Sequence, residues 1–158
     1  MALPLEQMVK CLGVSVSWDR AKWRMTVEDS KLSLLESGDT YYSESDVLWL
    51  SRLIFAMAAE ESLDAQIGVG SVCVNRLHNE AFARPANIYE VVTAKNQFTV
   101  ATNGMIYATP TESCVVAAKL ALEGCDLTHG ATFVNAGDMG AGYECVAQMG
   151  QLRFFTAA

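Results

Sequence analysis

The sequence has no excess of basic residues, few charges of either sign and no long apolar run. Charged residues make up 18% of the 158 positions, and the net charge is −7. Binding to phosphates needs a basic patch, so we expect no direct contact with nucleic acid. No stretch approaches the ~18 apolar residues of a membrane-spanning helix. These absences predict a soluble chain with no membrane span, and its acidity suits a protein partner with a basic surface.

The N-terminal residues MALPLEQMVK lack the pattern of a secretory signal peptide, in which a basic region precedes a longer apolar run. We therefore expect a chain that is made in the cytoplasm without a visible signal peptide. Earlier removal of a leader stays an open alternative.

The cysteines show neither a CxxC pair nor a His/Cys spacing typical of a zinc site. We predict no metal site and no cofactor. Their number, five, is odd, and most lie in apolar segments, where a free cysteine packs as a small hydrophobic residue. Reduced, structural thiols are the interpretation, for Cys11, Cys73, Cys114, Cys125 and Cys145.

Hydrophobic residues make up 51% of the chain, enough for a substantial core. Residues 1–28 combine helical spacing over 5–12 with two alternating stretches, VSVSWD and KWRMTVED, which predict a small helix plus β-hairpin appendage. Residues 29–43 are polar and are interpreted as a linker. The main domain is expected over residues 44–158.

The main domain is predicted to be mostly helical. Ser43 or Ser45 can cap a first helix, and a second over about 63–77 is rich in small residues, which indicates a buried central helix. Further helices are expected over 87–94 and 111–123. The glycine-rich tail predicts an irregular loop followed by one or two short strands.

Three segments in order carry a family likeness: LWLSRLIFA…GVGSVCVNRL, then NQFTVATNGMIYATPTESCVVAAKLALEG, then ATFVNAG…MGQLRFF. They resemble the SleB-type cell-wall hydrolases, the spore cortex-lytic enzymes. The resemblance implies a mostly α (α+β), lysozyme-like helical domain with small β elements. In addition, LGVSVSWD is similar to one unit of the copper-amine-oxidase-type N-terminal domain, which here implies no copper.

Enzymes of that family attack the glycan strand of peptidoglycan, as hydrolases or lytic transglycosylases. The resemblance implies a catalytic glutamate in a motif that reads roughly A-E-[AS]-x-G-E, whereas residues 56–61 here read AMAAEE. Met57 therefore stands at the position of the first glutamate, and Glu61 matches the second. The family also tends to end in G-x-H-x-F-[FY], and Leu152 replaces that histidine.

Cleavage of a glycosidic bond requires an acid at the leaving oxygen, and methionine has no transferable proton. On a continued helix, Glu61 would share the face of Met57 but lie ~6 Å further along, while Glu60 would be rotated by ~60°. Glu61 or Glu60 is therefore a candidate catalyst of a shifted site. The plainer alternatives are a core-filling Met57 and a solvated helix end, although acids near a C-terminus oppose the helix dipole.

Other positions that match the family are candidate contacts with substrate: Gln97 and Asn135 by hydrogen bonding, and Tyr107 by stacking on sugar rings. Each has a structural alternative, a polar turn for the amides and the aromatic core for the tyrosine. We expect Arg76 to pair with a nearby acid. Met57 and Leu152 would line the same groove.

Two functions from different classes follow. The one we favour is a hydrolase-like domain degenerate in catalysis, which binds a peptidoglycan glycan strand or a protein partner with a basic surface. The alternative is an active peptidoglycan glycosidase or lytic transglycosylase that uses Glu61 or Glu60 as its general acid. An active enzyme would work at the cell wall after export or release. A third reading, an acidic decoy for a basic groove, rests on charge alone.

Overall fold

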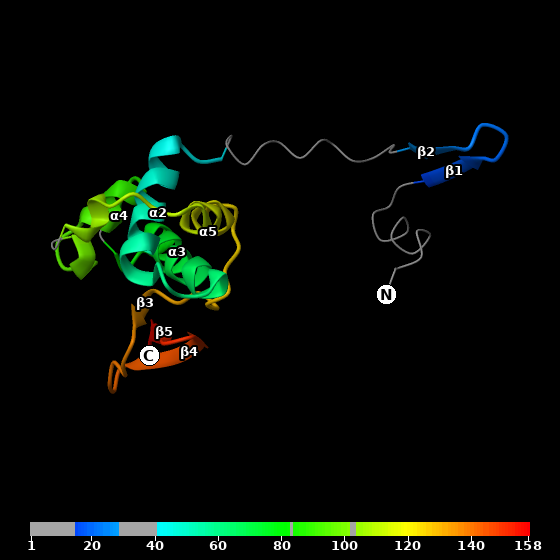
Figure 1. Ribbon diagram of the computed structural model, residues 1–158. Helices are drawn as coiled ribbons and strands as arrows, with labels where there is room; N and C mark the ends of the chain where they lie inside the picture. Colours follow the sequence, from blue (N-terminus) through cyan, green and yellow to red (C-terminus); the bar gives the residue numbers. More distant parts are fainter. Residues whose placement is uncertain (1–14, 29–40, 83, 102–103) are drawn as a thin grey trace. The chain divides into compact units, whose positions relative to one another are not determined.

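The computed structural model describes residues 15–28, 41–82, 84–101 and 104–158. The chain divides into two compact units, Met1–Ser37 and Gly38–Ala158 (Figure 1). The helix predicted over residues 5–12 and nearly all of the linker predicted over 29–43 lie outside the described residues. The domain boundaries therefore stay predictions.

In the first unit, the described residues form a β-hairpin. Strand β1 (Ser15–Asp19) pairs antiparallel with β2 (Arg24–Glu28). The turn is closed by the Asp19 carboxylate, which accepts hydrogen bonds from the backbone N–H groups of Ala21 and Lys22 at 3.0 and 3.2 Å. An aspartate that binds the backbone two residues on is a common turn device, so the turn follows from local sequence.

The α-helices described in the second unit begin after short polar N-cap residues, as predicted for the first of them. They are α2 (Glu44–Ala58), α3 (Leu63–His78), α4 (Ile88–Thr93) and α5 (Glu112–Leu122), with N-caps Ser43, Ser62, Asn87 and Thr111. At the first of them, Ser43 and Asp46 form a reciprocal capping box. Two 3-10 turns, η2 (Thr99–Ala101) and η3 (Met105–Tyr107), precede α5.

Helix α3 is the buried centre of this unit and packs against both α2 and α5 (Figure 1). Its close packing depends on two glycines. A Cβ atom on Gly68 would lie 2.6 Å from Cζ of Phe154, and one on Gly70 would lie 2.8 Å from Cβ of Ala121. The central helix predicted from the small residues is therefore confirmed, with its physical reason.

The C-terminal part contains more β structure than predicted. Strands β3 (Phe133–Asn135), β4 (Tyr143–Met149) and β5 (Leu152–Ala157) form an antiparallel sheet in the order β3-β5-β4, with an irregularity between Cys145 and Ala147. The predicted loop followed by one or two short strands is confirmed by β4 and β5, whereas β3, which precedes the glycine-rich loop, was not predicted. The mostly helical fold with small β elements is confirmed.

The packing of α3 yields a stability prediction. We expect Gly68→Ala to lower the free energy of unfolding by about 1–2 kcal/mol. Overpacking against the fully buried Phe154 costs about 1–3 kcal/mol, and the better helix propensity of alanine offsets up to about 1 kcal/mol of it.

Urea denaturation of both proteins measures this difference. Gly137→Ala serves as a control because nothing lies closer than 4.0 Å to its added Cβ. A Gly68→Ala protein as stable as the unaltered chain would show that a methyl group at position 68 fits beside the Phe154 ring without cost.

Candidate active site

The two candidate glutamates lie in the turn between α2 and α3, not on a helix. Helix α2 ends at Ala58 with Ala59 as its C-cap, and Ser62 caps α3. The backbone N–H of Glu61 donates to the carbonyl oxygen of Ala58 at 3.1 Å. The helix does not continue to Glu61, so its position is set by this turn.

One buried amide fixes the turn. Gln66 is 2% exposed, and its Nε2 donates to the carbonyl oxygens of Ala58, Ala59 and Glu61 at 3.1, 3.4 and 3.3 Å. Its Oε1 accepts a short hydrogen bond from Ser113 Oγ on α5. Gln66 therefore connects the end of α2, the start of α3 and α5. We did not single it out from the sequence, although a lone glutamine in a run of small apolar residues is an available signal.

Glu61 is half-buried and its carboxylate faces the turn between β4 and β5. A Cβ atom on Gly150 would overlap the Glu61 carboxylate, and Gly150 has a φ of +59°. Among the described residues, this carboxylate has no hydrogen-bond or ion-pair partner. Glu60 is exposed. The turn thus brings one acid, Glu61, against the sheet and leaves the other in solvent.

Met57 and Leu152 are apolar side chains at positions where the resemblance implies polar ones. Met57, in the last turn of α2, is half-buried and packs against the hydrophobic core. Leu152 is 8% exposed, belongs to that core, and pairs with Met149 across the β4–β5 hairpin. Neither side chain can donate or accept the proton that glycosidic cleavage requires.

Gln97 lies beside a buried arginine. Nη1 of Arg76 donates to the backbone and side-chain oxygens of Gln97 at 3.0 and 3.1 Å, and Nε donates to the Thr132 carbonyl at 2.6 Å. The guanidinium carbon lies 4.4 Å from the ring centre of Phe98. The predicted acidic partner of Arg76 is wrong, because carbonyl oxygens and aromatic faces surround it instead. Burial lowers the pKa of Arg76 to about 10.

The remaining candidates lie elsewhere on the unit. Asn135 is exposed and ends β3, where it pairs with Arg153 of β5. Tyr107 lies on η3 and is 67% exposed. Its ring is edge-on to that of Trp49, with ring centres 6.2 Å apart. Met57 and Glu61 therefore lie at the α2–α3 turn, while Gln97 binds Arg76 and Tyr107 packs on Trp49.

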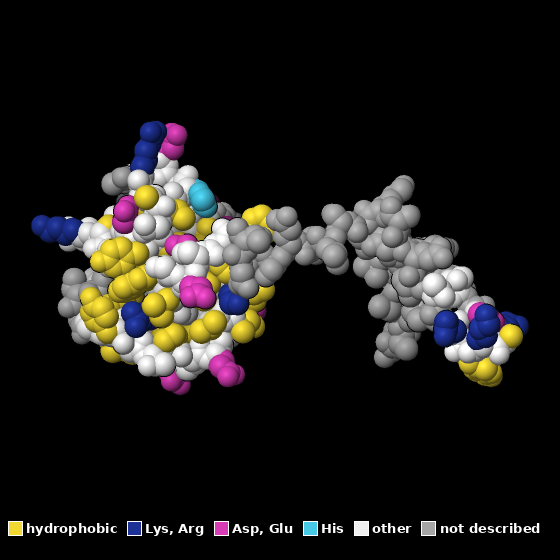
Figure 2. Space-filling model, turned by 90° about the horizontal axis from the view of Figure 1, so that it is seen from above, with side chains coloured by type: hydrophobic (Ala, Val, Ile, Leu, Met, Phe, Trp, Pro, Cys, Tyr) yellow, Lys and Arg dark blue, Asp and Glu magenta, His cyan; other side chains and the backbone are white. Residues whose placement is uncertain are grey.

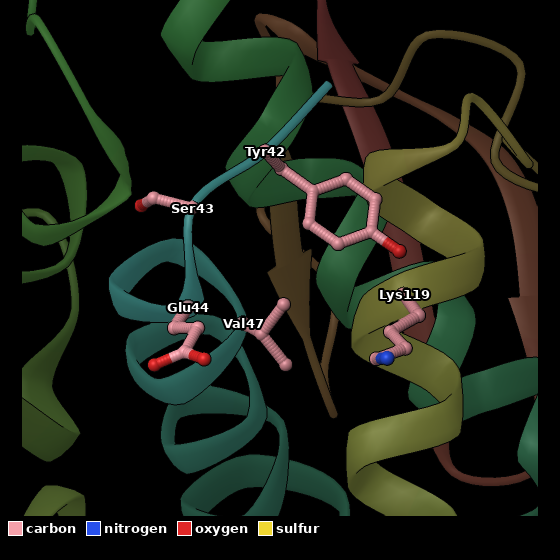
Figure 3. Close-up of a pocket in the computed structure, with 5 residues that line it drawn as sticks. All are labelled: Tyr42, Ser43, Glu44, Val47 and Lys119. Atoms are coloured by element: carbon pink, nitrogen blue, oxygen red, sulfur yellow. The ribbon is translucent and has the colours of Figure 1, made fainter. Parts of the chain in front are cut away.

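A pocket of about 450 Å³ lies at the other end of α2 (Figure 3). Its lining contains none of the candidate residues; it consists of Tyr42, Ser43, Glu44, Val47 and Lys119. The Tyr42 hydroxyl donates to Glu123 Oε1 at 2.9 Å. This pocket is therefore separate from the α2–α3 turn.

The described part of the chain offers neither a cluster of metal ligands nor a membrane-spanning helix. No group of three or more His, Cys, Asp or Glu side chains gathers there as a metal centre requires. Within the same residues, no helix has the length and apolarity needed to cross a bilayer.

Known proteins resemble the second unit in sequence. The family model described as Cell Wall Hydrolase matches residues 60–155. A spore cortex-lytic enzyme of Halalkalibacterium halodurans is 34% identical over 92 residues, which are 58% of this chain and 27% of that protein. The spore cortex-lytic enzyme of Bacillus subtilis is 27% identical over 92 residues, or 58% of this chain and 30% of that protein. The chain thus spans roughly a third of these relatives.

Solved structures resemble it in fold. The catalytic domain of the Bacillus cereus SleB protein has a TM-score of 0.65 at 22% identity, and the match covers 81% of this chain and 100% of that domain. The catalytic domain of the germination-specific lytic transglycosylase SleB from Bacillus anthracis has a TM-score of 0.64 at 23% identity. The match covers 73% of this chain and 97% of that domain. The predicted lysozyme-like α+β fold is thereby confirmed.

The Gln66 contacts yield a second stability prediction. We expect Gln66→Met to lower the free energy of unfolding by about 2–4 kcal/mol, because the carbonyl oxygens at the turn lose their donor and an unsatisfied buried polar group costs about 1–3 kcal/mol.

Denaturant unfolding tests this expectation, with the exposed Gln151→Met as the matched control. If both variants unfold at the same denaturant concentration, the amide does not hold the turn.

Proposed function

The chain belongs to the cell wall hydrolase family, and we propose that it binds the glycan strand of peptidoglycan without cleaving it. The observation that carries this proposal is Met57. A thioether, half-buried against the core, stands where the resemblance implies the catalytic glutamate. Methionine cannot protonate the leaving oxygen of a glycosidic bond.

Glu61 is a poor substitute for that acid. It lies beyond the end of α2, in a turn fixed by Gln66, and its carboxylate faces Gly150. A misplacement of ~1 Å can cost ~100-fold in rate, and Glu61 projects from a turn rather than from the helix that carries Met57.

The second candidate function is an active glycosidase or lytic transglycosylase with Glu61 as general acid. One observation favours it: the Glu61 carboxylate is half-buried and has no partner among the described residues. A side chain without a partner in the protein is available to contact a bound substrate. Glu60, exposed in the same turn, has no such support.

A protein partner with a basic surface is the alternative occupant. It is supported by the net charge of −7 alone. The family match favours the glycan, since the relatives are named for action on spore cortex. Binding of this kind would take place at the cell wall, after export or release of the chain.

The test compares the unaltered chain with three variants on purified peptidoglycan. Release of reducing ends or anhydro-muropeptides measures cleavage, and sedimentation with the insoluble polymer measures binding. We expect the unaltered chain, Glu61→Gln and Met57→Gln to bind without cleavage. Met57→Glu should gain measurable turnover, because it restores an acid at the implied position.

Met57→Gln is the matched control, since glutamine has the shape of glutamate but no transferable proton. Turnover by the unaltered chain that disappears in Glu61→Gln would establish the active-enzyme alternative. Failure of the unaltered chain to sediment with peptidoglycan would refute glycan binding and leave a basic protein partner as the occupant to seek.

A further inference from the structure

Three aromatic side chains from three separate elements meet on the surface of the second unit. Trp49 of α2 lies edge-on to Tyr89 of α4, with ring centres 4.8 Å apart at 61°, and to Tyr107 of η3, at 6.2 Å and 77°. Such tilted arrangements are favourable for aromatic pairs. We call these three residues the aromatic platform.

The platform is open to solvent rather than part of the core. Tyr89 is 46% and Tyr107 is 67% exposed, and Met105, next to Tyr107 in η3, is 48% exposed. Figure 2 shows hydrophobic side chains gathered on one face of this unit, with Lys and Arg side chains among them. Exposed apolar groups that cluster instead of being scattered mark interaction sites.

A cation completes the platform. The guanidinium of Arg52, one turn after Trp49 on α2, lies 5.3 Å from the Trp49 ring centre. Arg52 forms no ion pair with any described residue, and its buried Nε has no hydrogen-bond partner there. In a chain with a net charge of −7, this is a positive group without a carboxylate beside it.

Backbone contacts hold the platform in place. The backbone N–H of Ile88, next to Tyr89, donates to Oδ1 of Asp46 at 3.3 Å, and the other carboxylate oxygen of Asp46 belongs to the capping box of α2. The N–H of Tyr107 donates to the carbonyl of Gly104 at 3.2 Å. Rings that are already positioned lose little freedom on binding, so affinity is gained.

We propose that the aromatic platform stacks on sugar rings of the peptidoglycan glycan strand, while Arg52 binds a carboxylate of the peptide stems. This inference rests on the proposed function and adds a contact surface away from the α2–α3 turn. Trp49 precedes Met57 by ~12 Å along the helix axis and by ~80° around it. An extended strand is long enough to contact both regions.

Charge favours this occupant over the alternatives. Peptidoglycan combines the rings that aromatic faces bind with carboxylates that pair with a guanidinium. A basic protein surface would place further cations against Arg52 and offer it no carboxylate to pair with. The platform therefore suits a glycan that carries acidic groups.

The experiment measures the affinity of the full chain for two probes, purified peptidoglycan and N-acetylglucosamine oligomers, which carry no stems. Tyr89→Ala and Tyr107→Ala should each weaken binding to both probes by about tenfold, through lost ring contact. Arg52→Gln should weaken binding to peptidoglycan by about fivefold and leave oligomer binding unchanged, whereas Arg52→Lys should retain most of the affinity.

Tyr143→Ala is the matched control. Tyr143 is a partly exposed tyrosine on β4 that lies edge-on to Phe133, with ring centres 5.0 Å apart. The Tyr143→Ala variant should bind both probes as tightly as the unaltered chain. Unfolding midpoints confirm that each variant is folded.

The outcomes separate the two proposals. If the unaltered chain binds neither probe, the proposed function fails. If it binds, but Tyr89→Ala and Tyr107→Ala bind as tightly, the glycan is held elsewhere and the platform assignment is overturned. Equal losses for Tyr143→Ala would also overturn it. If Arg52→Gln changes the affinity for peptidoglycan and for the oligomers by the same factor, the carboxylate contact is refuted.

Discussion

The close packing of α3 is the constraint on which the rest of the second unit depends. Its glycines let Phe154 and Ala121 approach the helix, so the sheet and α5 share one core with α2. The same helix carries Gln66, whose side-chain amide donates hydrogen bonds to carbonyl oxygens of the α2–α3 turn. Packing and site geometry are therefore coupled: the helix that centres the core also fixes the position of Glu61.

Under the proposed function, this coupling is the reason that Glu61 does not take the role of an acid at position 57. A neighbouring carboxylate can replace a missing catalyst only if the backbone that carries it can move. Here Glu61 lies in a turn that is tied to α3 and, through Ser113, to α5. Met57 of α2 packs against the hydrophobic core, and Leu152 of β5 is part of it. Both features support the proposal that the chain binds the glycan without cleaving it.

Local signals in the sequence predicted the helices well. Ser43 and Thr111 mark helix starts through hydrogen bonds to residues three positions on, so the relevant contacts are local. The third strand was missed because β3 pairs with β5 across a long glycine-rich loop, and no local pattern encodes that pairing. The named partners of Arg76 come from two separate segments, around Gln97 and Thr132, and the aromatic platform comes from three. Position 57 was identified through the family resemblance, whereas the hydrogen-bond partners of Gln66 became clear only from the fold.

The most direct test of the central claim is mass spectrometry of the soluble material after long incubation of intact peptidoglycan with a large excess of the unaltered chain. The account predicts no reducing-end or anhydro-muropeptides above the level of a protein-free incubation, because no acid occupies the position of Met57. Accumulation of either product in proportion to the amount of chain would contradict it.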